Sequence, residues 1–278
     1  MRRMLTAGLA VGLTSTGLFG LAPAASAAAG DATVSVLHAI PAGAGADRVD
    51  VYAGDQLLLD NLTPGTLETL RVPGGTYDLA VFADGDSPGS GTPVLEAADT
   101  QVPAGANATV TANLTEGGDP ALNVFVNDTA KTAAGEGRLT VRHVAAAPAV
   151  DVRAGAEVVF GDVTNPNENK IDLPAGTVSA DVVLAGTDTV ALGPADVPIK
   201  EGVNTIVYAW GSAEGDSLEL AVQEVGGLHS APRGVPAGEV GLADSSQLPV
   251  WAFTVLGLAL LGATLSGARL VVARPRGR

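Results

Sequence analysis

Short runs of alternating apolar and polar residues, separated by Gly, Pro, Asn and Asp, cover most of the chain between residues 31 and 225. An alternation with a period of two, as in Tyr77, Leu79 and Val81, is typical of a β-strand with one buried face. Many short strands at close spacing are typical of a β-sandwich. The pattern therefore predicts an all-β protein.

The middle of the chain contains an internal duplication at an offset of about 101 positions. The run Val49–Gly54 aligns with Val150–Gly155, and the match continues without a gap to Pro73–Thr76 over Pro174–Thr177. In each copy an Ala-Gly turn, at Gly54 and at Gly155, predicts a hairpin in which Gly takes a positive φ. We therefore predict two tandem Ig-like antiparallel β-sandwich domains.

The two ends of the chain have the composition of targeting segments. Met1–Ala27 has two arginines, then an apolar run, and ends at Ala25-Ser26-Ala27, as a secretory signal peptide does. Leu248–Ala268 is uncharged and about 21 residues long, enough to cross a bilayer as a helix. The expected organisation is a signal peptide at 1–27, repeats at 31–128 and 138–225 with a linker at 129–137, a stalk at 226–247, a transmembrane helix at 248–268 and a basic cytoplasmic tail at 269–278.

Composition and charge exclude several classes of function. The chain of 278 residues has no cysteine, 15 basic and 30 acidic residues, and a net charge of -15. The lack of cysteine excludes disulfides and thiolate chemistry, and the acidity argues against a nucleic-acid partner. All the acidic residues lie between the two predicted targeting segments. The exported part is therefore expected to be strongly acidic and soluble. The predicted C-terminal helix makes the membrane an expected partner.

Two motifs, each present in both copies, resemble a known family. His38-Ala39-Ile40-Pro41 followed by Val49–Gly54, with its counterpart from His143 to Val152, is similar to the opening signature of the domain of unknown function 4397 family. Val72–Tyr77 and Leu173–Thr177 resemble the same family's mid-domain turn. The resemblance implies Ig-like sandwiches on secreted or envelope-anchored bacterial proteins, with no established activity and no catalytic residues.

A histidine and an aspartate occupy equivalent places in the two copies, as His38 with Asp50 and His143 with Asp151. Such a pair could transfer protons, which keeps an exported hydrolase as an alternative function. Serine is sparse near both pairs, so neither has an evident nucleophile beside it. The interpretation we favour is structural, with each histidine bonded to the turn before a proline and each aspartate bonded to loop amides.

The segment Asp84–Gly89 is an acidic, Gly-rich loop that could hold a hard cation. It does not fit an EF-hand, because Pro88 is at the fifth place and Leu95 at the twelfth. We therefore favour a solvated hairpin loop. We assign no catalytic, cofactor-binding or metal-binding residue from the sequence, and expect no cofactor.

One strand differs sharply between the copies. Its polar face in copy one carries Asn107, Thr109, Thr111 and Asn113, whereas the aligned face in copy two carries Asn204, Ile206, Tyr208 and Trp210. If the polar face points outward, copy two exposes an apolar stripe. Ile206, Tyr208 and Trp210 would then form a contact surface, either for the first domain or for an outside partner. The alternative is a different register that places them in the core.

We interpret the chain as a single-pass cell-membrane protein with an extracellular ectodomain and a non-enzymatic role in adhesion, scaffolding or ligand binding. Its partner could be an envelope protein or a glycan, although an ectodomain with Trp210 as its only tryptophan gives little support for a lectin. Besides the hydrolase, the remaining alternative is an accessory subunit of an envelope complex.

Overall fold

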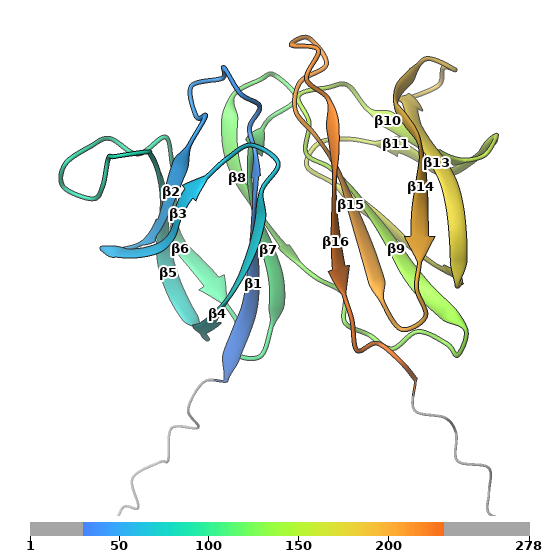
Figure 1. Cartoon of the computed structure of the whole chain (residues 1–278), viewed down its shortest axis with the longest axis horizontal. Helices are drawn as coiled ribbons and strands as arrows, with labels where there is room; N and C mark the ends of the chain where they lie inside the picture. The colour runs from blue at the N-terminus through green and yellow to red at the C-terminus, as the bar shows by residue number, and fades with distance from the viewer. Residues whose placement is uncertain (1–29, 231–278) are drawn as a thin grey trace, which may run out of the picture. The chain divides into compact units, whose positions relative to one another are not determined.

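The computed structural model describes residues 30–230, which contain sixteen β-strands and no helix. All sixteen strands belong to one compact unit that ends at Ser230. They form four four-stranded sheets, two for each repeat (Figure 1). The prediction of an all-β fold with two sandwiches is confirmed at this level.

The first repeat consists of β1 to β8. One sheet has the order β4-β1-β7-β8 and the other the order β3-β2-β5-β6. The strands are β1 (Asp31–Ala39), β2 (Val49–Ala53), β3 (Gln56–Leu62), β4 (Leu67–Pro73), β5 (Gly75–Ala83), β6 (Leu95–Val102), β7 (Asn107–Leu114) and β8 (Pro120–Val126).

The second repeat has the same topology, with sheets in the orders β12-β9-β15-β16 and β11-β10-β13-β14. Each strand therefore has a counterpart eight elements earlier, as expected for a duplication. The strands are β9 (Glu136–His143), β10 (Val150–Ala154), β11 (Glu157–Val163), β12 (Glu168–Pro174), β13 (Gly176–Leu184), β14 (Val190–Ile199), β15 (Asn204–Trp210) and β16 (Glu219–Val225).

The expectation of wholly antiparallel sheets is wrong at one pair in each repeat. β1 pairs with β7 in parallel, and β9 pairs with β15 in parallel, while the remaining pairs are antiparallel. A parallel pair needs a long crossover connection, and here several strands of the partner sheet supply it. Alternation along a strand shows which residues share a face but not which strand lies beside it, so the direction of pairing was not predictable.

The predicted hairpin turns are present. Gly54 between β2 and β3 has φ 56°, and Gly155 between β10 and β11 has φ 64°. No atom lies within 4 Å of a Cβ built on either glycine, so the positive φ, and not crowding, accounts for the residue type.

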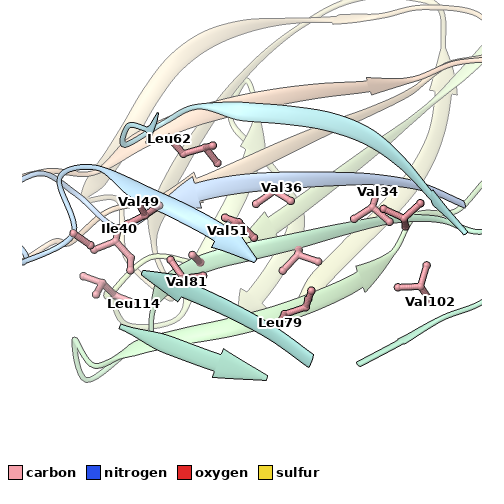
Figure 2. Close-up of a cluster of buried hydrophobic side chains, with 14 of the residues drawn as sticks. Val34, Val36, Ile40, Val49, Val51, Leu62, Leu79, Val81, Val102 and Leu114 are labelled. Carbon is pink, nitrogen blue, oxygen red and sulfur yellow. The ribbon is translucent and has the colours of Figure 1, made fainter. Parts of the chain in front are cut away.

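Each repeat encloses its own hydrophobic core between its two sheets. The first core is formed mainly by valines and leucines of β1, β2, β5 and β7 (Figure 2), among them Val34, Val36, Val51, Val81 and Val110. The second is formed mainly by the equivalent strands and includes Leu139, Val141, Val152 and Val207, together with Phe160 of β11. The inward positions of the alternating pattern therefore make up both cores.

A third hydrophobic cluster joins the two repeats, with Leu37 and Ala39 from the first and Ile206, Tyr208 and Trp210 from the second. Along β7, β9 and β15 nearly every residue is buried, which means that both faces of these strands are covered. One face lies on the repeat's own core. The other lies on the β4-β1-β7-β8 or β12-β9-β15-β16 sheet of the other repeat, as the contacts described below show.

The predicted signal peptide, most of the predicted stalk and the predicted transmembrane helix lie outside the described residues. Between residues 30 and 230 there is no helix with the length and apolar character needed to cross a membrane.

Candidate functional site: the interface between the two repeats

The three residues singled out by sequence are all buried between the repeats. Ile206 and Tyr208 are 0% exposed and Trp210 is 3% exposed. They cluster with Leu37 and Ala39 of β1, and Phe125 of β8 packs against the same group. The structure thus places this face of β15 against the first repeat and leaves none of the three side chains at the surface.

The expectation that the aligned polar face of β7 points outward is wrong. Thr109, Thr111 and Asn113 are all 0% exposed. Period-two alternation had correctly separated this face from the core face of Val110 and Ala112. The second repeat contacts this face, since Thr109 donates to Gln223 of β16 at 3.0 Å.

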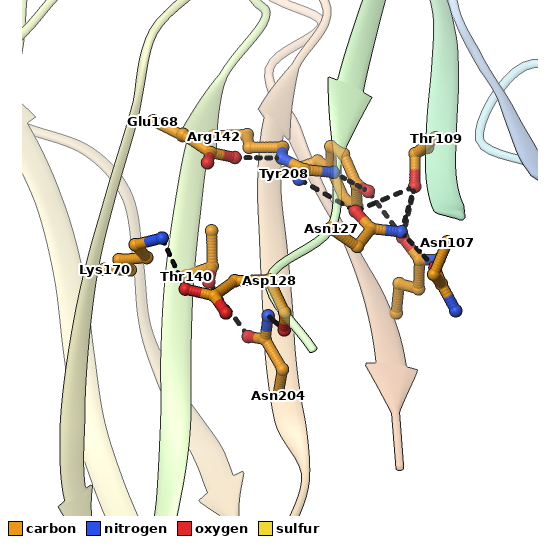
Figure 3. A network of polar contacts seen from close by, with 11 residues as sticks. Asn107, Thr109, Asn127, Asp128, Thr140, Arg142, Glu168, Lys170, Asn204 and Tyr208 are labelled. Carbon is orange, nitrogen blue, oxygen red and sulfur yellow. Dashed lines mark hydrogen bonds and ion pairs between the residues drawn. The ribbon is translucent and has the colours of Figure 1, made fainter. Parts of the chain in front are cut away.

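Arg142 is the central polar residue of this interface and is only 1% exposed. Its Nε donates to Glu168 at 2.7 Å, Nη1 to the Tyr208 hydroxyl at 2.7 Å, and Nη2 to Oδ1 of Asn127 at 2.8 Å (Figure 3). The guanidinium carbon lies 4.4 Å from the ring centroid of Phe125. A buried charge is tolerated only when it is paired and hydrogen-bonded, and Arg142 meets both conditions with partners from both repeats.

Gln223 of β16 continues the network from the opposite side. The Tyr208 hydroxyl donates to its Oε1, and so does Thr109 of the first repeat at 3.0 Å. Its Nε2 donates to Oγ of Ser35 on β1 at 2.9 Å. The chain from Arg142 through Tyr208 to Gln223 therefore binds side chains of β1, β7 and β8, and fixes how the two sheets face each other.

An ion-pair group closes one margin of the interface. Arg138 lies 2.8 Å from Asp128 and 2.7 Å from Asp172. Lys170 contacts Asp128 as well (Figure 3). The hydrogen bond from Lys170 lowers the pKa of the Asp128 carboxyl, and the bond to Asp172 raises the pKa of Arg138. Both shifts keep these groups charged, so the margin is held by complementary charges.

The contacts follow an approximate two-fold relation between the repeats. The β3–β4 turn of the first repeat brings Gly65 to the ring of Trp210, so close that a Cβ at Gly65 would lie 3.1 Å from Cζ2. In the equivalent β11–β12 turn, Nδ2 of Asn165 donates to the carbonyl of Leu114 at 2.8 Å. Each repeat therefore places the same turn on the end of the other repeat's central strand, as in an isologous dimer.

In each copy the histidine and the aspartate form hydrogen bonds to loop residues and not to each other. Nε2 of His38 donates to the Ala46 carbonyl at 2.7 Å, and Nε2 of His143 to the Pro148 carbonyl at 3.0 Å. Asp50 accepts from the Asn61 amide and Asp151 from the Asp162 amide, each at 2.8 Å, where both donor residues have a positive φ. Among the hydrogen bonds of residues 30–230, none joins His38 to Asp50 or His143 to Asp151. The geometry is that of two structural bonds repeated in each copy.

Burial gives these histidines a measurable effect on stability. Desolvation lowers the pKa of both His38 and His143 below the ordinary value of 6.5. The unfolded chain therefore binds these protons more readily than the folded chain, so the stabilisation is complete above pH 6.5 and is lost as the pH falls toward the folded-state pKa.

We expect the free energy of unfolding of residues 28–247 to fall between about pH 7 and pH 5, by up to about 1.4 kcal/mol per pH unit for each histidine. Urea unfolding at a series of pH values measures it. The shifted carboxyls of Asp128, Asp151 and Asp181 titrate below their ordinary value of 3.8 and stay charged in this range. A His38→Gln/His143→Gln variant should be nearly independent of pH there; an unchanged pH dependence would contradict the assignment.

The acidic loop borders a hollow on the outer face of the first repeat. The hollow has a volume of about 530 Å³, and Pro88 and Gly89 of the loop form part of its wall beside Asp55, Asp78 and Glu96. Within residues 30–230 no group of three or more His, Asp or Glu side chains is arranged to hold a metal ion. In the second repeat the aligned outer face has an ion pair, because Arg153 bonds Asp181 at 2.7 Å.

Sequence reasoning missed Arg138 and Arg142. They alternate with Leu139 and Val141 along β9, which is the usual pattern of a strand with a solvated face. The duplication could have identified them, because the aligned positions on β1 carry the uncharged residues Thr33 and Leu37. Charged residues in only one copy indicate that the two copies use this face differently.

Comparison with known proteins agrees with the resemblance seen in the sequence. A family model described as "Domain of unknown function (DUF4397)" matches residues 32–153, which span the first repeat and reach β10 of the second. No curated protein matches the chain significantly. Among solved structures, "The Bacillus anthracis TIE protein" is 12% identical with a TM-score of 0.21 and is matched over 64% of this chain. The chain spans about a third (33%) of that protein's length, and a TM-score this low does not establish a shared fold.

Proposed function

We propose that this protein, which carries a domain of the DUF4397 family at residues 32–153, is a non-enzymatic binding protein displayed on the outer face of a bacterial cell membrane. The family's description assigns no activity, so the proposal rests on the structure of the two repeats and on the predicted targeting segments. Adhesion, scaffolding and ligand presentation are the roles that such a display serves.

The observation that supports display best is that the described unit begins and ends at the same end of its strands. At the start of β1 the Gly30 carbonyl accepts from Gly105, and beyond β16 the Leu228 carbonyl accepts from Thr132 in the linker. The β1–β2, β7–β8, β9–β10 and β15–β16 connections lie at the other end (Figure 1). Attachment through the predicted C-terminal helix would hold these loops away from the membrane, and loops on a rigid scaffold are common binding sites.

The interface also supports a binding role over a catalytic one. The polar side chains at the interface form one hydrogen-bonded network through Arg142, Tyr208 and Gln223. His38 and His143 are buried and bonded to loop carbonyls, which gives no support to the hydrolase alternative. An accessory subunit of an envelope complex stays the second candidate, and co-purification with a stable partner would favour it.

Display can be tested directly because the chain has no cysteine. A single cysteine at Glu214→Cys, in the exposed β15–β16 loop, should react with a membrane-impermeant maleimide on intact cells. A single cysteine at Gly277→Cys, in the predicted cytoplasmic tail, should react only after lysis. Labelling of both or of neither on intact cells would contradict the predicted orientation.

The binding role is tested with purified ectodomain, residues 28–247, titrated onto isolated envelope from the same bacterium. We expect saturable retention that unlabelled ectodomain displaces, since a specific partner offers a finite number of sites. Retention that rises linearly with concentration, or none at all, would leave a structural spacer as the better account.

A further inference from the structure

A groove runs along the margin of the interface opposite the ion-pair group. It has a volume of about 290 Å³ and lies between β1, β4 and β7 of the first repeat and β16 of the second. Its wall from the first repeat consists of Thr33, Ser35, Leu67, Thr69 and Asn107, and its wall from the second of Val222–Gly226.

The approximate two-fold relation makes this groove the counterpart of the closed margin. The strand registers align Thr33 with Arg138 and Thr69 with Lys170, and they extend to Gly226 with Asp128. On the closed margin these three charged residues meet in ion pairs. On the open margin, two hydroxyl side chains and a glycine stand in their place, and the groove lies beside them.

The groove carries neutral hydrogen-bonding groups on a fixed floor. Ser35 is 1% exposed and bonds both Thr69 and Gln223, which is 7% exposed and accepts two further hydrogen bonds, from Tyr208 and Thr109. Oδ1 of Asn107 accepts from Asn127 at 2.6 Å, and among residues 30–230 its Nδ2 donates to no partner (Figure 3). Hydroxyls and amides that can both donate and accept thus meet apolar groups of Leu67, Val222 and Val225.

The groove offers no charge for an ionic ligand. Its single charged residue, Glu224, is 41% exposed at the side chain and pairs with Lys200 at 2.7 Å. An anion would meet no cation in the wall, and a cation would compete with Lys200. The chemistry that matches mixed donors and acceptors with small apolar patches is a neutral polyol with C–H faces.

We propose that this groove binds a neutral saccharide, one or two sugar rings in length. A volume of about 290 Å³ lies near the lower bound for small-molecule pockets and so limits the bound part to a short unit. Asn107 Nδ2 and the Thr33 and Thr69 hydroxyls bond the sugar hydroxyls, while Leu67 and Val222 contact the ring carbons. The inference deepens the proposed binding role and rests on it.

Lys170 of the closed margin suggests a variant that would fill the groove, because it aligns with Thr69. A Thr69→Lys variant introduces the residue that the second repeat has at the aligned position, and its long side chain crosses the groove. Thr69 is exposed, so the substitution should leave the fold intact. A Thr177→Lys variant, at an exposed position of β13, makes the same change in charge elsewhere. Urea unfolding of both variants checks stability.

Saturation-transfer NMR of the ectodomain with maltose, cellobiose and chitobiose measures binding. We expect at least one of these disaccharides to receive saturation from the wild type and from Thr177→Lys, with at least a tenfold loss of affinity in Thr69→Lys. A signal of equal size in Thr69→Lys, or no signal from any of the three disaccharides, would overturn the proposal.

The envelope titration separates failure of this inference from failure of the proposed function. If envelope binding is saturable but identical in the wild type and Thr69→Lys, and the disaccharides give no signal, the protein binds elsewhere and the groove assignment is wrong. If the ectodomain does not bind envelope at all, the proposed binding role is wrong.

Discussion

Replacing Arg142 with methionine should lower the free energy of unfolding of the ectodomain by about 3 kcal/mol, the lower end of the cost of breaking a buried ion pair. The lower end applies because Glu168, the partner left behind, is 29% exposed at its side chain and can be solvated by water. The loss also removes the donors to Tyr208 and Asn127 and the cation above Phe125.

Trp210 provides the measurement, since it is the only tryptophan between residues 28 and 247. Its ring is buried against Gly65 of the first repeat, so loosening of the interface should shift its emission to longer wavelength before either core unfolds. Urea titrations followed by fluorescence and by circular dichroism give the two readings. The control is Arg48→Met, which removes the same charge from an exposed arginine and should change stability by less than about 0.5 kcal/mol. Equal effects in the two variants would show that Arg142 does not hold the repeats together.

Replacing Trp210 with alanine should cost about 3 to 5 kcal/mol, as expected for a large aromatic side chain removed from a packed site. The cost is almost wholly one of packing, because the indole Nε1 is buried without a hydrogen-bond partner among the described residues. The cavity would open between the repeats and not within either sandwich, since Trp210 belongs to the cluster shared with Leu37 and Ala39.

Circular dichroism in urea measures this loss without the missing fluorophore. A Trp210→Phe variant keeps part of the ring contact and should lose clearly less. A matched truncation in the second core alone, Phe160→Ala, removes a ring from one sandwich and leaves the interface intact. A loss below about 1 kcal/mol for Trp210→Ala would show that the two repeats do not pack on this residue.

The class of fold, the duplication and the main turns could be predicted from the amino-acid sequence alone. Alternation at Tyr77, Leu79 and Val81 and the glycines at 54 and 155 are local signals, because a strand face and a positive φ depend on neighbouring residues only. The expected bonds of the aligned aspartates to loop amides are present in both copies, at Asp50 and at Asp151.

What covers each strand face depends on how the two repeats pack and could not be predicted from the sequence. Period two separates the two faces of β7 and β15 but does not show that a second sheet lies on the outer one. The sequence therefore predicted an outward-facing Thr111 and left Tyr208 open between a contact surface and the core, whereas both are buried. Arg142 had the same ambiguity, because an arginine whose hydrogen-bond acceptors are 15 and 66 positions away looks in the sequence like any surface arginine. Contacts between distant segments depend on how the repeats pack, and for the same reason the groove beside β16 appears only once the two sandwiches are placed face to face.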